Sequence, residues 1–181
     1  GSDYFVFYLL DVCGHGVGAA LLSISIINML RSHGGSSQDL LDPEKILLML
    51  NERFPMEEHN DMFFTIWYGV YNQKTRELKY ASAGHPPAVL VNVEGGKKKV
   101  TELRTGGMVI GATPLASFPT ATCVIPGRSQ MYLFSDGIYE LPKADGTILK
   151  LDEFLNIFSG AAENGVTETE RILRFFRTLM G

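Results

Sequence analysis

The stretch that decides the fold begins at Phe63 and reads FFTIWYGVY as far as Tyr71. Aromatic and β-branched residues fill this stretch, which is typical of a β-strand that reaches a hydrophobic core. The same aromatic side chains could stack on nucleic-acid bases. Their alternation and their flanking residues favour the core strand, and the rest of the chain is interpreted outward from it.

Five more strands follow this one, with Gly, Pro or Asn turns between them. We expect them over Glu77–Ala83, Ala88–Val93, Lys99–Arg104, Thr120–Ile125 and Gln130–Ser135. Because no helix separates them, consecutive strands imply antiparallel hairpins.

Helices are expected on both sides of this strand-rich region. A first strand, Tyr4–Val12, precedes a helix over 17–33, a breaker over 34–37 and a second helix that starts at Asp42-Pro43 and ends near Phe54. Two further helices are expected near the end of the sequence, over 151–158 and 167–180. The order strand, helices, strands, helices predicts an α+β fold with helices packed on antiparallel sheets.

The composition of the 181 residues is that of one globular domain, which we expect to span 1–181. A net charge of -4 without a dense basic stripe argues against a nucleic-acid partner. We interpret Lys97-Lys98-Lys99, after Gly95-Gly96, as a solvated hairpin tip rather than a docking patch.

The sequence also bears on the compartment. The longest apolar run, Ala19–Leu30, contains Ser23, Ser25 and Asn28, so we expect no insertion into a membrane. Cys13 and Cys123 lie far apart and are predicted to be free thiols, as in a reducing cytoplasm.

Two aspartates carry the chemical signal. Asp11 ends the first strand and precedes a glycine-rich turn, where backbone can come close to a ligand because glycine tolerates dihedrals that a Cβ forbids. Asp136 ends the apolar strand over 130–135 and precedes Gly137. Either motif alone is more often an ordinary turn, and the two can converge only through the fold.

Carboxylates at strand ends suit hard divalent cations such as Mg²⁺ or Mn²⁺, which prefer carboxylate, carbonyl and water oxygens. Two such ions can activate a bridging water and neutralise a phosphate, so that no phosphorylated enzyme residue is needed.

Three segments together resemble the signature blocks of the SpoIIE-type phosphatases, the bacterial branch of the metal-dependent PPM serine/threonine phosphatases. They are DVCGHG over 11–16, SAGHPP over 82–87 and FSDGIYE over 134–140, in the family's order and approximate spacing. The resemblance implies two packed antiparallel β-sheets flanked by helices, in a PPM-phosphatase-like β-sandwich. It also implies hydrolysis of phosphoserine or phosphothreonine on a bacterial regulatory protein of the anti-sigma-factor-antagonist type.

The resemblance also implies roles for single residues. Asp11 would bridge two metal ions, the Val12 carbonyl would complete one coordination shell, and Asp136 would ligate the other side. The substrate loop would be formed by Gly14, His15, Gly16 and Gly137. A sensory or receiver domain usually precedes such a phosphatase in the full-length protein.

Two family features are absent here. The family has a Gly-Gly-Asp segment upstream of the first block and an Asp-Asp segment in a last strand. Here Asp3 is too close to Asp11 to be the first, and Leu179–Gly181 end on a helix where the last strand should follow. We therefore expect the first metal-binding segment and the last strand to be missing. Gly1-Ser2 is interpreted as a tag remnant, and the cut strands could leave sheet edges that pair into a dimer.

The histidines leave alternatives open. His15 could protonate a leaving alkoxide, but animal and plant relatives place such a histidine where this chain has Cys13, so a loop-shaping role is favoured. His85 is expected to brace the hairpin beside the site rather than to bind metal.

Two other functions compete with a phosphatase. One is a non-catalytic phosphatase-like module that binds a partner. The other is dinucleotide binding, because Gly14, Gly16 and Ala19 satisfy G-x-G-x-x-G/A between a strand and a helix. No second parallel strand with an acidic end follows at the expected distance, which disfavours the second alternative.

Overall fold

The computed structural model describes residues 3–32, 38–95, 97–143, 145–160 and 166–180. The chain divides into two compact units, Gly1–Pro87 with Arg104–Ile125 and Ala88–Leu103 with Pro126–Gly181. Each unit has its own sheet and its own core, so the single domain over 1–181 stays a prediction. The tag remnant predicted at 1–2 and the breaker predicted at 34–37 lie outside the described residues.

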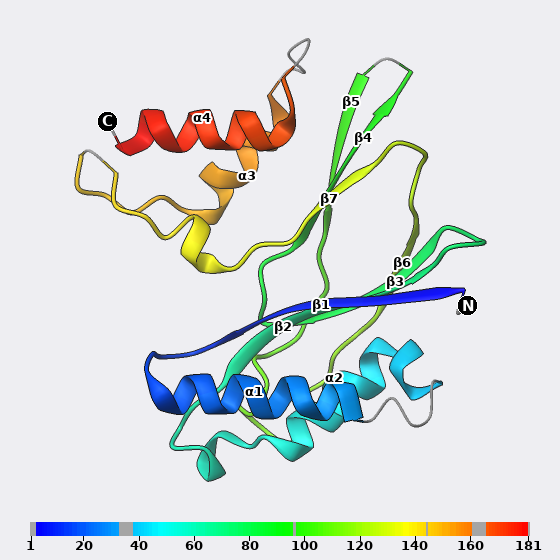
Figure 1. Ribbon diagram of the computed structural model, residues 1–181, viewed down its shortest axis with the longest axis vertical. Helices are drawn as coiled ribbons and strands as arrows, with labels where there is room; N and C mark the ends of the chain where they lie inside the picture. The colour runs from blue at the N-terminus through cyan, green and yellow to red at the C-terminus, as the bar shows by residue number, and fades with distance from the viewer. Residues whose placement is uncertain (1–2, 33–37, 96, 144, 161–165, 181) are drawn as a thin grey trace. The chain divides into compact units, whose positions relative to one another are not determined.

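The first unit is built on a four-stranded antiparallel sheet with the order β1-β2-β3-β6 (Figure 1). Its strands are β1 (Tyr4–Val12), β2 (Phe64–Asn72), β3 (Glu77–Ala83) and β6 (Ala121–Val124). The longest pairing joins β1 to β2, from Tyr4 opposite Asn72 to Val12 opposite Phe64. The decisive stretch is thus a central strand, as predicted.

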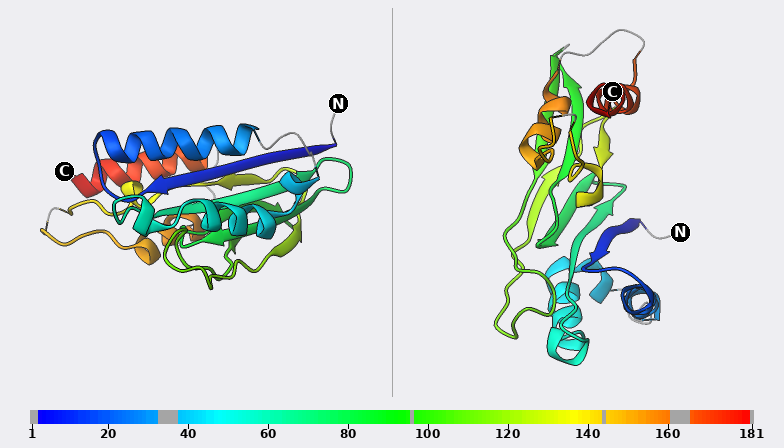
Figure 2. Two further views of the ribbon diagram at one scale, coloured as in Figure 1. Left: turned by 90° about the horizontal axis from the view of Figure 1, so that it is seen from below. Right: turned by 90° about the vertical axis from the view of Figure 1, so that its left-hand side faces the viewer.

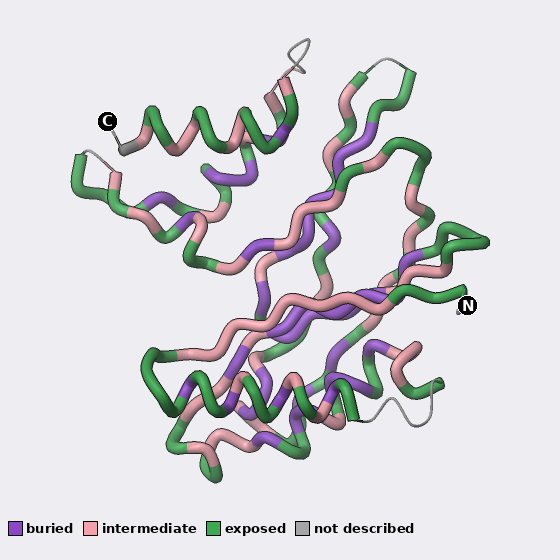
Figure 3. Tube along the Cα trace, viewed as in Figure 1, coloured by how far each residue is buried: buried purple, intermediate pink, exposed green. Residues whose placement is uncertain are grey.

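Helices cover one face of this sheet, as the views in Figures 1 and 2 agree. They are α1 (Val17–Ser32), η2 (Asp39–Leu41), α2 (Pro43–Arg53) and η3 (Met56–Glu58). Because strand side chains alternate, the even-numbered residues from Phe64 to Val70 enter the helix-covered core: Phe64, Ile66, Tyr68 and Val70. They pack with Leu22, Ile26, Leu30, Ile46, Leu47 and Leu50, which are buried (purple in Figure 3).

The second unit is built on a three-stranded antiparallel sheet with the order β5-β4-β7. Its elements are β4 (Ala88–Glu94), β5 (Lys97–Leu103), β7 (Gln130–Tyr132), η4 (Asp136–Ile138), α3 (Leu151–Ser159) and α4 (Glu168–Met180). The core is rich in rings: Phe134 lies 4.9 Å from Phe154, which lies 5.7 Å from Phe158 (centroid distances). This second cluster holds the helices against β4.

The prediction of an α+β fold with two antiparallel sheets and helices is confirmed. The prediction that consecutive strands form hairpins holds for β2 with β3 and for β4 with β5, but it is wrong for β3 and β4, for β5 and β6, and for β6 and β7, because the members of each of these pairs belong to different sheets. The first of these changes of sheet has a local cause. Pro86 and Pro87 stand between β3 and β4, and proline has no amide hydrogen for a ladder. The chain therefore leaves one sheet there and enters the other.

The strand expected over 130–135 is shorter than predicted and ends at Tyr132. It pairs with β4, with Tyr132 opposite Val89. Continuing that register would set Phe134 opposite Pro87, which cannot donate a hydrogen bond. Asp136 is therefore not at the strand end but four positions later, in the 3₁₀ turn η4.

The predicted hairpin is observed, because Lys97 pairs with Glu94 next to the turn between β4 and β5, and Lys97 and Lys99 are exposed. The prediction of a solvated loop is wrong for Lys98, which belongs to β5. Lys98 lies on the inward face, and its Nζ is 2.6 Å from Glu168 Oε1 of α4. Arg171 also donates to both Glu168 oxygens, at 3.0 Å each. This buried cluster of Lys98, Glu168 and Arg171 ties α4 to β5.

No helix among the described residues combines the length and the apolar character that crossing a bilayer requires.

We predict that Glu168→Gln lowers the free energy of unfolding of the second unit by about 3 kcal/mol, because two buried cations lose their counter-charge. The Glu168 side chain is 10% exposed. Glu94→Gln is the matched control, since Glu94 pairs with Lys99 at 68% exposure and should cost less than about 1 kcal/mol. Denaturant titration of both variants checks this, and equal losses would contradict it.

Candidate functional site

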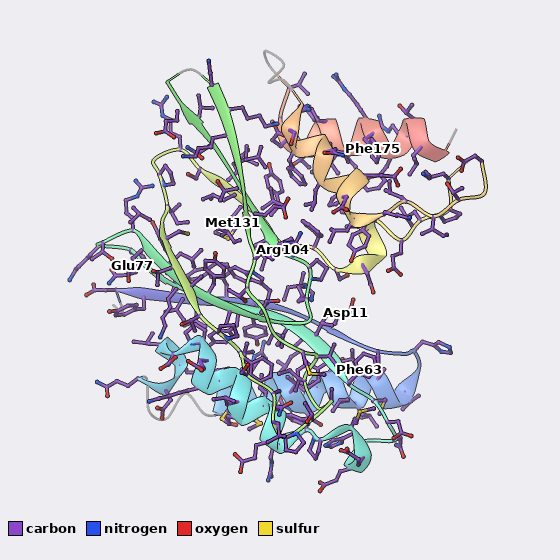
Figure 4. All side chains as sticks on the ribbon, turned by 180° about the vertical axis from the view of Figure 1, so that it is seen from behind. Asp11, Phe63, Glu77, Arg104, Met131 and Phe175 are labelled. Carbon is purple, nitrogen blue, oxygen red and sulfur yellow. The ribbon has the colours of Figure 1, made fainter. Side chains whose placement is uncertain are left out.

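Asp11 stands one residue before the end of β1, on the face of the first sheet that the helices do not cover. The even-numbered residues Val6, Tyr8, Leu10 and Val12 pack against the helix-covered core, so Asp11 points the other way. Figure 4 shows it on that side. Thr65 is its direct partner on β2, so the two side chains share a face.

The Val12 carbonyl points toward the open edge of β1. Cys13 N donates to Phe63 O at 3.0 Å, so in the alternating antiparallel pattern Val12 and Phe64 form a pair without mutual hydrogen bonds. Accordingly, Ile110 N donates to Phe64 O at 2.9 Å on the opposite side of β2. Among the described strands, only β2 pairs with β1, so this carbonyl faces away from the ladder.

The turn after β1 is exposed and open. Gly14 and Gly16 adopt φ of +87° and +90°, which L side chains rarely adopt, and a Cβ at either would meet no atom within 4 Å. His15 lies exposed between them. Helix α1 then begins at Val17, so its free amide groups follow the turn directly.

Asp136 lies on an exposed turn of the second unit, held by its backbone. Its carbonyl accepts hydrogen bonds from Tyr139 N (2.9 Å) and Glu140 N (2.8 Å). Phe134 and Tyr139 flank the turn, and both rings pack near Phe154 of α3. Gly137 follows Asp136 at the tip of η4.

The structure therefore brings Asp11, Val12, Gly14, His15 and Gly16 together at one end of β1. Asp136 and Gly137 belong to the other unit. The predicted convergence of the two aspartates stays a prediction.

Sequence reasoning missed Thr65, and the expectation that His85 braces the hairpin beside the site stays a prediction. Thr65 Oγ1 and His85 Nδ1 are 2.7 Å apart, and the His85 side chain is buried. Ser82 Oγ donates to the His85 carbonyl at 3.1 Å. The signal for Thr65 was its alternation with the core residues of β2, but only the register shows that it stands opposite Asp11.

The donor atoms fit a hard divalent cation in kind, because a carboxylate and an outward-facing carbonyl adjoin at the end of β1. In number they are few: the described residues contain no group of three or more His, Cys, Asp or Glu side chains placed to hold a metal ion. Asp11 and Val12 would therefore form only part of a coordination shell.

The structure also shows the state of the two cysteines. Cys13 and Cys123 are free, as predicted, and burial raises the pKa of the Cys123 thiol.

The dinucleotide-binding alternative is wrong, because β1 pairs with antiparallel β2, and the described strands form two antiparallel sheets rather than a parallel one.

Comparison with known proteins gives a family match and remote relatives. The family model for Stage II sporulation protein E (SpoIIE) matches residues 1–178. Protein IcfG of Synechocystis sp. is 27% identical over 162 residues, covering 76% of this chain and 25% of IcfG. Phosphoserine phosphatase RsbU of Bacillus subtilis is 26% identical over 144 residues, covering 80% of this chain and 42% of RsbU. The chain thus spans less than half the length of either relative.

A solved structure agrees in fold. The SiaA-PP2C domain of Pseudomonas aeruginosa superimposes with a TM-score of 0.70 at 18% identity, covering 99% of this chain and 74% of that one. At this identity the likeness bears on the fold.

We predict that Gly84→Ala destabilises the first unit by about 2–4 kcal/mol, because backbone strain adds to overpacking beside His85. Gly84 has φ +65°, and a Cβ there would come within 2.6 Å of Val109 Cγ1. Gly95→Ala is the control for strain alone, with φ +57° and open space around it, and should cost about 1 kcal/mol. Thermal unfolding of both variants measures this difference; equal costs would refute the packing contribution.

Proposed function

This chain belongs to the SpoIIE family, and from that premise we propose that it hydrolyses phosphoserine or phosphothreonine on a regulatory protein. The observation that carries the proposal is the end of β1, where Asp11 and the Val12 carbonyl precede an open turn with two glycines at positive φ. Such an end offers oxygen ligands and backbone amides together, the combination that a phosphate with its cations requires.

We propose that Asp11, Val12 and Asp136 hold the divalent ions, Mg²⁺ or Mn²⁺. When bound, such ions would neutralise charge on the phosphate as Lewis acids and would lower the pKa of a bound water, which would make a hydroxide nucleophile available near neutral pH. The chain's own residues fix the donors: Asp11 by its place in the ladder, and Asp136 by the aromatic anchors of its turn. Gly14, His15, Gly16 and Gly137 form the substrate loop, in which the glycines leave room for a phosphoryl group.

The role of His15 is proposed to be shaping of this loop. It is exposed between two glycines, so it is free to reach a leaving group as a general acid as well. Replacing His15 with Gln separates the roles, because a general acid would leave an altered pH profile of kcat and a loop residue would not.

The proposed partner is a phosphorylated regulatory protein of the anti-sigma-factor-antagonist type, with a sensory or receiver domain preceding this region in the full-length protein. Two free thiols support a cytoplasmic location. The open edge of β1 supports pairing with a second copy.

The competing proposal is a phosphatase-like module that binds its partner without turnover. The small number of metal-ligating side chains among the described residues favours it. Hydrolysis of a small aryl phosphate with added Mn²⁺, measured on the full-length protein and on this chain, separates the two. Partner binding without hydrolysis of any phosphoprotein offered would support the module.

We predict that Asp136→Asn and Asp11→Asn each lower aryl phosphate hydrolysis by the full-length protein by more than about 100-fold, since even a group that only supports a metal ligand is worth up to about 100-fold. Both proteins should stay folded by circular dichroism. Asp152→Asn, in the exposed first turn of α3, is the control and should keep normal activity. Unchanged turnover in either site variant would remove that aspartate from the site.

We also predict that Mn²⁺ raises the Tm of the wild-type protein and that EDTA reverses the rise, because an ion that binds the native state stabilises it by mass action. Asp11→Asn should abolish the rise. A scanning-fluorimetry titration measures it, and an equal rise in Asp11→Asn would place the ion elsewhere.

A further inference from the structure

Three polar side chains near the end of β1 are related by strand register and by one hydrogen bond: Asp11, Thr65 and His85. Asp11 and Thr65 are directly opposite in β1 and β2, in a hydrogen-bonded pair whose Cα atoms are typically ~5.5 Å apart. Thr65 Oγ1 then lies 2.7 Å from His85 Nδ1. The threonine hydroxyl therefore contacts the imidazole and belongs to the strand residue directly opposite Asp11, on the same face of the sheet.

The imidazole is held in place by the loop that carries it. Ser82 Oγ donates to the His85 carbonyl at 3.1 Å, and Ser82 N donates to Thr105 Oγ1 at 2.8 Å. Gly84 N donates to Gly107 O at 3.1 Å, and His85 is 8% exposed. A side chain fixed in this way can fix the group that it contacts.

The donor and acceptor capacity of the Thr65 hydroxyl determines which hydrogen bonds it can form at the same time. A threonine has one hydrogen to donate and two lone pairs to accept with. When Nδ1 of His85 carries the ring proton, it donates to Oγ1, and the Thr65 hydrogen is left for the carboxylate opposite. Carboxylates only accept when ionised, so this arrangement suits an ionised Asp11.

The surroundings strengthen such a hydrogen bond. Trp67 is two residues along β2 from Thr65, on the same face, and is fully buried. Its ring stacks on Tyr80 with centroids 5.4 Å apart. Hydrogen bonds in surroundings of low dielectric orient their partners more strongly than exposed ones do.

We propose that His85 is a positioning residue, which acts through the Thr65 hydroxyl to fix the rotamer of the Asp11 carboxylate and so sets its affinity for a divalent cation. The inference rests on the proposed function for the role of Asp11 as a ligand. In this proposal the histidine of the SAGHPP segment positions a residue at the end of β1 and does not itself contact metal or substrate.

The test measures Mn²⁺ binding by calorimetry without substrate, on the full chain. Thr65→Val keeps the shape of the side chain but removes the hydroxyl, and should raise the Kd for Mn²⁺ by about 10- to 100-fold. Thr65→Ser keeps the hydroxyl and should bind as the wild type does. His85→Ala should weaken binding similarly, and the double variant should be no weaker than Thr65→Val, because both changes break one path.

If His85 had only a structural role, His85→Ala would lower the Tm of the metal-free protein, so this Tm is measured alongside. If His85→Ala does not fold, the difference in Mn²⁺ affinity between Thr65→Val and Thr65→Ser tests the inference. Wild-type affinity in Thr65→Val, additive effects in the double variant, or no Mn²⁺ binding by the wild type would overturn the inference. If the Kd for Mn²⁺ changes as predicted but the protein hydrolyses no phosphate ester, the proposed phosphatase function is refuted and the inference about His85 still holds.

Discussion

The antiparallel register of β1 on β2 is the constraint on which the candidate site depends. With Val12 opposite Phe64, the even-numbered side chains of β1 from Val6 to Val12 pack against the helix-covered core, and the odd-numbered ones between them face the other way. The same register turns the Val12 carbonyl outward and sets Thr65 against Asp11. Burial of the aromatic and aliphatic residues thus positions the polar ones.

The two aspartates are supported by different physical means. Asp11 is held by a ladder of backbone hydrogen bonds in which its neighbours are buried on one side. Asp136 sits on an exposed turn whose carbonyl accepts two amides, between Phe134 and Tyr139. A ladder tolerates little variation in length, whereas an aromatic clamp tolerates changes in the exposed turn between its anchors.

Local patterns predicted most elements of the fold, because alternation, glycine turns and the Asp42-Pro43 start are encoded by neighbouring residues. The β3 strand was predicted with its observed bounds. The errors arose where distant residues decide: β7 ends early because its register would reach Pro87, and Lys98 is buried because Glu168, 70 positions away by numbering (168 − 98), neutralises it. For the site, glycines and aspartates indicated the β1 turn, but the position of Thr65 depends on pairing that no single segment contains.

The alternation of β1 side chains between the two faces of the sheet also limits how the length of this strand can vary during evolution. Deleting one residue between Tyr4 and Leu10 would put the residues before the deletion out of alternation with those after it. Either Asp11 would enter the helix-covered core while Leu10 left it, or the residues before the deletion would exchange faces. Length changes are therefore compatible with this strand only in steps of two, while the turn at 73–76 can absorb single residues. Gaps in alignments of related sequences are expected to collect in such turns and to spare β1 and β2.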